Sequence, residues 1–356
     1  MKKIIFIAAG IFALVSCSKV ETAGVDSDQL LTFNVVNYSL QTRVDAYSQD
    51  ESFGTFAYWA ASDWATSKTG TPFFENEKIS YSPSYAQGEW GPAQARYWTK
   101  TGTITFASYS PYVGGAEKGF SAVPTYSYEG GFQFSNYTVT DASDVDVMVA
   151  DLMADQTKNN PSYKVSGNTD GVPTLFHHVM TRVAIAFKAA ENPNPNNGCE
   201  IIVKGVKIEG ANNTGSYTQN NDPVWADQAG NASYEFNAAA DTIILKTGGE
   251  TRTTKTVENR ILLPQSLGTA ATADAEAVPG PQNLVVDLTI RTKYGEDWAE
   301  ENVSYTIPLY SDTIPAWDPN MSIVYTVTIN PVDDKSPILF DPAVVPWESK
   351  DGSLSL

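Results

Sequence analysis

The chain has 356 residues, of which 42% are hydrophobic and 12% aromatic. This composition is typical of a protein that folds, and it argues against a disordered chain. The formal net charge is −18, and such an acidic surface argues against nucleic acid as a partner because it repels phosphate groups. The length predicts more than one domain.

The first residues have the pattern of a targeting segment. Lys2 and Lys3 precede an apolar run, residues 4–15, that is too short to span a membrane unaided. The run leads into Leu-Val-Ser-Cys at residues 14–17, which resembles a bacterial lipobox. We therefore predict a lipoprotein signal peptide over residues 1–16 and acylation, with palmitate among the chains, at Cys17. An ordinary signal peptide followed by an incidental cysteine is the alternative.

The segment after the predicted lipidation site is polar. Residues 17–29 therefore predict a flexible tether between the lipid and the folded part. Cys199 is the other cysteine of the chain, so an acylated Cys17 leaves it without a partner within the chain. We expect neither a disulfide nor a cysteine-based zinc site.

Apolar residues that alternate with polar ones predict strands along the rest of the chain. Leu31, Phe33 and Val35 form such a face, which predicts a strand over residues 30–38. The alternation changes phase near Gly205, as a β-bulge requires. Further alternating runs lie at 103–107, 144–149, 183–188, 201–208, 257–263, 284–290 and 321–329.

Clusters of Gly, Pro and Asn separate these runs, and no window has a convincing helical stripe. Many short strands with regular turns predict an all-β protein built from sandwiches. We expect two of them, an N-terminal β-sandwich over residues 30–172 and a C-terminal β-sandwich over residues 173–356.

The residues that could carry chemistry are few. The sequence has no nucleophile elbow, no Walker loop and no dinucleotide fingerprint. His177 and His178 would point to opposite faces of a strand, which prevents them from binding one metal together. Asp144 and Asp146 would share one face of a strand. We interpret this pair mainly as part of a solvated surface, with a cation or sugar site as the alternative. We therefore predict no enzyme, no cofactor and no metal.

Aromatic residues are abundant in the first third of the chain. They fill sandwich cores in many proteins, and they also form platforms that bind sugars. The residues concerned are Tyr58, Trp59, Trp64, Trp90, Tyr97 and Trp98.

Several stretches, taken in their order along the chain, resemble the fimbrillin family, the lipoprotein-derived pilins of type V pili. The resemblance covers most of the chain. The stretches are the lipobox, the strand at 30–38 with Thr42-Arg43, Arg96–Trp98 with the strand at 103–111, Asp146–Ala150, Leu175–Val183, Ile261–Gln265, Trp317 with Tyr325–Ile329, and Ile338 with Val344 and Trp347.

The resemblance implies two transthyretin-like β-sandwiches in tandem and assembly by donor-strand exchange. A protease would cut between Arg43 and Val44 and remove the strand that carries Leu31, Phe33 and Val35. The groove would then take a strand of another fimbrial subunit, because an open sheet edge with apolar pockets favours strand addition. Val44 departs from the alanine that is commoner in the family. The choice between a stalk, tip or anchor role, and which C-terminal segment is a donor strand, stay open.

The implied location is the outer membrane, reached through the acylated Cys17, and the fimbrium at the cell surface. The implied partners are other fimbrial subunits, outer-membrane lipid, and host or bacterial surface glycans or proteins. The alternative function is a monomeric surface lipoprotein that binds glycans through exposed aromatics. Exposed coplanar tryptophans would favour that alternative, whereas a removable N-terminal strand would favour the pilin.

Overall fold

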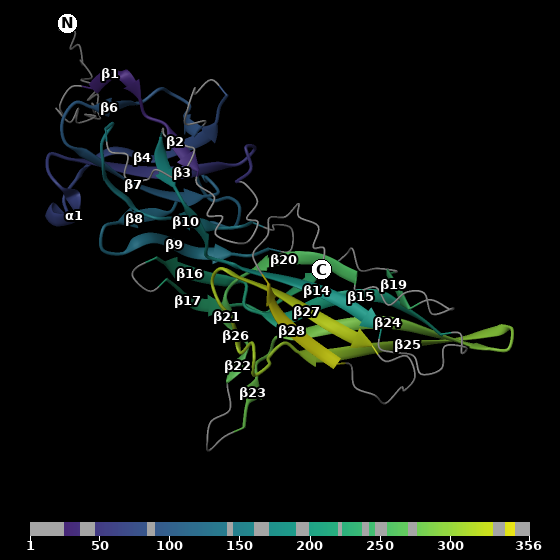
Figure 1. The fold of residues 1–356 in the computed structure, drawn as a ribbon. Coiled ribbons are helices and arrows are strands. Elements are labelled where there is room, and N and C mark those ends of the chain that lie inside the picture. Colours follow the sequence, from purple (N-terminus) through teal and green to yellow (C-terminus); the bar gives the residue numbers. More distant parts are fainter. Residues whose placement is uncertain are drawn as a thin grey trace, which may run out of the picture.

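The computed structural model describes residues 25–35, 47–83, 90–140, 145–159, 171–189, 199–219, 223–236, 242–245, 255–269, 276–329 and 339–345. The fold is all-β, as the alternating pattern predicted, and the helix found in these ranges is the single turn α1 (Trp64–Ser67). None of the described segments forms a helix of the length and apolarity needed to cross a membrane. Figure 1 shows the sheets following one another along an elongated molecule.

The N-terminal part is built around a nine-stranded sheet. Its strands run in the order β12-β2-β5-β4-β3-β7-β10-β13, with β11 paired to β7. Their bounds are β2 (Phe33–Val35), β3 (Ser52–Ala60), β4 (Thr71–Tyr81), β5 (Trp90–Pro92), β7 (Thr103–Ser110), β10 (Met148–Ala150), β11 (Met153–Gln156), β12 (Val172–Thr174) and β13 (Phe176–His178).

One short stretch of chain reaches both ends of this sheet. Strand β12 pairs with β2 at one end and β13 pairs with β10 at the other, yet Leu175 alone separates β12 from β13. The sheet therefore curls around an apolar core. This core contains Leu31, Phe33, Phe53, Ala57, Phe74, Ile79, Trp90, Trp98, Ile104, Phe106 and Val172.

The sheet also buries residues on its outer face. In β7, Ile104 and Phe106 face the inner core, whereas Ala107 and Tyr109 belong to a second apolar cluster. Tyr109 packs edge-on against Phe132, with ring centroids 5.4 Å apart. Strand β7 is thus buried on both faces, which explains its nearly continuous apolar and small-residue sequence.

A four-stranded sheet in the middle of the molecule supplies this outer cover (Figure 1). Its order is β17-β16-β9-β8, from β8 (Thr125–Ser127), β9 (Gly131–Thr138), β16 (Thr214–Thr218) and β17 (Val224–Ala229). Two of these strands precede the predicted domain boundary at residues 172 and 173, and two follow it. Tyr217 pairs with Phe134 across the sheet, so strands from both sides of that boundary are hydrogen-bonded to each other.

The C-terminal part packs a four-stranded sheet and a five-stranded sheet face to face. One has the order β20-β14-β27-β28 and the other the order β18-β15-β24-β25, with β19 paired to β15. The bounds are β14 (Thr181–Ala189), β15 (Cys199–Ala211), β18 (Ala232–Glu235), β19 (Thr242–Leu245), β20 (Lys255–Leu262), β24 (Asn283–Tyr294), β25 (Asp297–Pro308), β27 (Met321–Ile329) and β28 (Leu339–Val345). Small two-stranded sheets join β21 (Gln265–Ser266) to β26 (Ala316–Trp317) and β22 (Gly268–Thr269) to β23 (Val278–Pro279).

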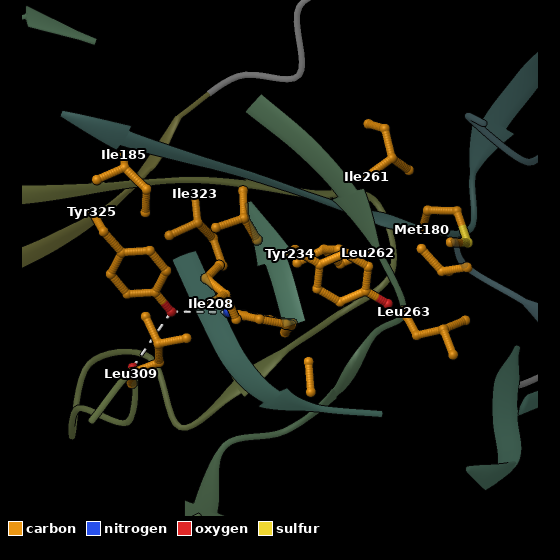
Figure 2. Packing of buried hydrophobic residues seen from close by; sticks show 14 of the residues in the cluster. Met180, Ile185, Ile208, Tyr234, Ile261, Leu262, Leu263, Leu309, Ile323 and Tyr325 are labelled. Carbon is orange, nitrogen blue, oxygen red and sulfur yellow. Dashed lines mark hydrogen bonds between the residues drawn. The ribbon is translucent and has the colours of Figure 1, made fainter. Parts of the chain in front are cut away.

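The core of this part is dense and largely aliphatic. Figure 2 shows Ile185, Ile323 and Tyr325 near Ile208, with the hydroxyl of Tyr325 turned toward Leu309. The register of β15 against β24 shifts between Val203 and Gly205, which confirms the predicted bulge.

The N-terminal strand differs from the prediction of one strand over residues 30–38. The structure has β1 (Val25–Leu30), which pairs with β6 (Tyr97–Thr99), and then the separate strand β2. The chain changes partners at Leu31 and Thr32, and this change divides the strand. Strand β1 begins at Val25, so residues 25–29 of the predicted tether lie in a strand, while residues 36–38 lie outside the described ranges.

Candidate functional site

The candidate site is the place that β2 occupies between two other strands. Phe33 lies opposite Trp90 of β5 in an antiparallel pair, and β2 runs parallel to β12 on its other side. The flanking backbone is also bonded, because Val172 N–H donates to Thr32 O over 2.8 Å and Leu31 N–H donates to Arg96 O over 2.7 Å.

The side chains of this segment enter the inner core. Leu31 and Phe33 are both 0% exposed, whereas Val35 is half-buried at the rim. The Phe33 ring lies edge-on to Phe53 and to Phe106, with centroids 5.8 and 5.4 Å away. Burial of Leu31 and Phe33 stabilises the fold by about 1.5–3 kcal/mol each, so the N-terminal segment is an integral part of this core.

A glycine permits the close parallel approach of β12 to β2. Gly171 has φ +94°, a region that L-residues rarely adopt. A Cβ at this position would lie 3.0 Å from the carbonyl carbon of Phe33 and 3.2 Å from the amide nitrogen of Asn34. Gly171 therefore sets both the turn into β12 and the spacing of the two strands.

Tyr47 closes the core next to this site. Its ring stacks on Phe176 with a centroid distance of 5.3 Å and an interplanar angle of 17°, and it meets Trp90 edge-on at 5.1 Å. Its hydroxyl hydrogen-bonds to the hydroxyl of Ser110 over 2.7 Å. Burial raises the pKa of the Tyr47 phenol well above its ordinary value, so the folded state favours the neutral phenol.

The structure places the predicted site residues in two groups. Leu31, Phe33 and Val35 come together in the inner core, as their alternation predicted. The predicted lipidation site Cys17 and the predicted processing residues Arg43 and Val44 lie outside the described residues.

Sequence reasoning missed Tyr47, Gly171 and Val172 as parts of this site. For Gly171 a signal was present, since it ends an Asn-Thr-Asp-Gly turn. Tyr47 carried no comparable signal, because its partners Trp90 and Phe176 are far from it in sequence.

The histidines make two separate hydrogen-bonded contacts with aspartates and do not share a site. His177 Nε2 lies 2.9 Å from an oxygen of Asp151, and His178 Nδ1 lies 2.8 Å from an oxygen of Asp146. The first pair is about half exposed and the second is more buried. Asp146, a candidate cation or sugar ligand, is thus engaged by a histidine, while its predicted companion Asp144 lies outside the described residues. Within the described ranges no group of three potential metal ligands occurs.

The tryptophans are mostly buried. Trp64, Trp90, Trp98, Trp225 and Trp317 are each 9% exposed or less. Two others are half-buried and engaged: the indole N–H of Trp59 donates to Thr101 O, and the guanidinium of Arg291 lies 5.0 Å over the ring of Trp298. The part of the chain that the structure describes therefore presents no pair of exposed coplanar tryptophans.

The fold and this site define an all-β protein whose N-terminal strand β2 is enclosed in the inner core. The family model described as fimbrillin-like matches residues 42–347. The chain therefore belongs to the fimbrillin-like family. The match begins just before Arg43, so β1 and β2 precede the matched region. No curated protein matches the chain.

Two solved structures align with most of the chain. A fimbrial protein from Bacteroides vulgatus aligns with a TM-score of 0.63 and 18% identity, over 90% of this chain and 99% of that protein. A candidate cell adhesion protein from Bacteroides uniformis aligns with a TM-score of 0.48 and 15% identity, over 90% of this chain and 99% of that one. At these identities the first of them supports the fold alone.

Proposed function

We propose that this protein is a structural subunit of a cell-surface fimbria, with a role in adhesion and no catalytic activity. It would be exported as a lipoprotein through Cys17, held at the outer membrane, and then assembled by donor-strand exchange. Membership of the fimbrillin-like family supports the fimbrial role. The observation that supports strand exchange best is the position of β2, which lies N-terminal to Arg43 and fills the inner core between β5 and β12.

The physical consequence of cleavage between Arg43 and Val44 follows from these contacts. Release of the segment would remove Leu31 and Phe33 from the core and leave β5 and β12 without their shared neighbour. Unpaired backbone groups beside an open apolar pocket are costly, and an incoming strand satisfies both. In this proposal the predicted N-terminal sandwich, residues 30–172, accepts the strand of another subunit. Before cleavage, Leu31 and Phe33 of the chain's own N-terminal segment fill this site.

The alternative of a monomeric glycan-binding lipoprotein rested on exposed aromatics. The burial of most described tryptophans removes its main support. Surface glycans or proteins remain proposed adhesion partners of the assembled fimbria, alongside neighbouring subunits and the outer-membrane lipid.

The test is limited digestion with an arginine-specific protease, applied to the wild-type chain and to Arg43→Ala. We expect the wild type to lose its N-terminal segment and to form oligomers at high concentration when donor strand is present. The variant should stay intact at that position and stay monomeric. Arg182 and Arg260 serve as internal controls because they are 3% and 7% exposed and should resist cleavage. A wild-type chain that is cut at Arg43 yet stays monomeric with donor strand would contradict the proposal.

A further inference from the structure

We propose that the site left by β2 is selective for an aromatic ring, so that the strand which replaces β2 carries an aromatic residue at the position of Phe33. This inference rests on the proposed function and names the chemistry of the partner: a strand of a neighbouring subunit with a planar ring opposite Trp90 and Val172.

The walls of the pocket are themselves aromatic and nearly perpendicular to the bound ring. Phe53 and Phe106 meet Phe33 at interplanar angles of 83° and 85°. Edge-to-face pairs add stabilisation beyond the area that they bury, since the positive edge of one ring meets the negative face of another. A planar ring makes both contacts at once, whereas a branched or puckered aliphatic group makes neither.

The walls cannot close in on a smaller side chain. Phe53 is backed by Trp90 at 5.8 Å and by Phe176 at 5.3 Å. Phe106 is backed by Trp98 at 5.9 Å, again edge-on. Because this second layer of rings holds the first, a leucine at the site would leave unfilled space.

Every residue of this pocket follows Arg43 in the sequence and so stays in the processed subunit. Tyr47, close behind the proposed cut, belongs to the same aromatic cluster through Phe53, Trp90 and Phe176. The walls are therefore already in place before a partner arrives, as selective binding requires.

The neighbouring positions lack this selectivity. Leu31 is a buried aliphatic side chain, and Val35 packs at the half-buried rim. Selectivity for the incoming strand should therefore be concentrated at the position of Phe33. Val35 serves as the matched control position, where we expect little selectivity.

The first experiment uses the intact chain. Phe33→Leu and Val35→Ala are compared with wild type by equilibrium unfolding, which requires neither cleavage nor exchange. We expect Phe33→Leu to lower the denaturant midpoint clearly more than Val35→Ala. Equal midpoints for the two variants would overturn the aromatic pocket.

The second experiment uses the full chain after cleavage at Arg43, with labelled peptides of residues 25–35 as the incoming strand. The peptides carry phenylalanine, leucine or cyclohexylalanine at position 33; the last has a ring of similar size that is apolar but not planar. We expect the phenylalanine peptide to bind at least about tenfold more tightly than the other two.

The two proposals fail in different ways. Peptides that bind with equal affinity leave strand exchange standing and overturn the aromatic selectivity. If no peptide enters the cleaved chain although the intact Phe33→Leu variant is destabilised, strand exchange itself fails, and the inference about the partner fails with it.

Discussion

Two parallel strand pairs in the described structure are held in very different ways. Strand β14 pairs with β27 at nine successive positions and with β20 on its other side. Strand β2 pairs with β12 at three positions and with β5 at one. The first strand combines long backbone pairing on both sides with buried side chains such as Val183, Ile185 and Phe187. Strand β2 has little backbone pairing, so it is held mainly by the burial of Phe33, together with Leu31 just before it. A strand that is held by its side chains can be replaced by another strand that brings suitable side chains.

High pH should test both regions at once and gives the largest expected effect. Burial raises the pKa of Tyr109, Tyr137, Tyr217 and Tyr325, as it does for Tyr47 beside β2. The fold thus favours the neutral phenol, while an unfolded tyrosine ionises at about pH 10. Stability should hold below that pH and fall above it, by roughly 1.4 kcal/mol per buried tyrosine for each pH unit.

Equilibrium unfolding at about pH 8 and about pH 11 checks this expectation. Tyr325→Phe should weaken the pH dependence, whereas Tyr294→Phe should not, because Tyr294 is 67% exposed. A free energy of unfolding that stays constant across this range would contradict the prediction.

Trp317→Ala should show how the C-terminal sandwich responds to the loss of one buried ring. Trp317 is 1% exposed, and its indole N–H donates to the Tyr325 hydroxyl over 2.9 Å. Removing it should cost about 3–5 kcal/mol in the free energy of unfolding. Chemical denaturation measures the loss, with the 62% exposed Val278→Ala as a control that should be neutral. A cost below about 1 kcal/mol would contradict the role of the buried Trp317 ring in the core of the C-terminal sandwich.

Gly171→Ala should loosen β2 while leaving the C-terminal sandwich intact. The added Cβ would crowd the backbone of Phe33, and φ +94° is strained for alanine. We expect a cost of about 1–3 kcal/mol and faster hydrogen exchange at the Val172 amide, with no change at β27.

The matched control for Gly171→Ala is Gly295→Ala. Gly295 has φ +65° but nothing within 4 Å of an added Cβ, so it carries the conformational cost without the contact. Equal exchange rates at Val172 in the two variants would contradict a role for Gly171 in spacing β2 from β12.

Tyr47→Phe gives the smallest expected effect. It removes the hydroxyl that hydrogen-bonds to Ser110 but keeps the ring against Phe176 and Trp90. The free energy of unfolding should fall by about 0.5–1.5 kcal/mol. Tyr310→Phe, whose hydroxyl bonds to Asp312 at an exposed position, should change it less. A loss for Tyr47→Phe that is no larger than the loss for Tyr310→Phe would show that the ring stack, and not the hydroxyl, holds Tyr47.

The sequence by itself determined what depends on local alternation and turn chemistry. A period of two places every second residue on one face, and this was enough to predict an all-β chain, the shared face of Leu31, Phe33 and Val35, and the bulge at Gly205. The order of its motifs was also enough to indicate the fimbrillin family.

Only the tertiary structure decided which strands meet. The division between β1 and β2, the parallel neighbour β12, the ring of Tyr47 over Phe176, and the middle sheet drawn from both sides of residue 172 all depend on contacts between distant segments. Alternation predicts that a strand has one apolar face, but it does not predict which strands pair with it. The partners are fixed when the faces of distant segments pack into one core, because pairing gains its free energy from neighbours that the local sequence does not contain.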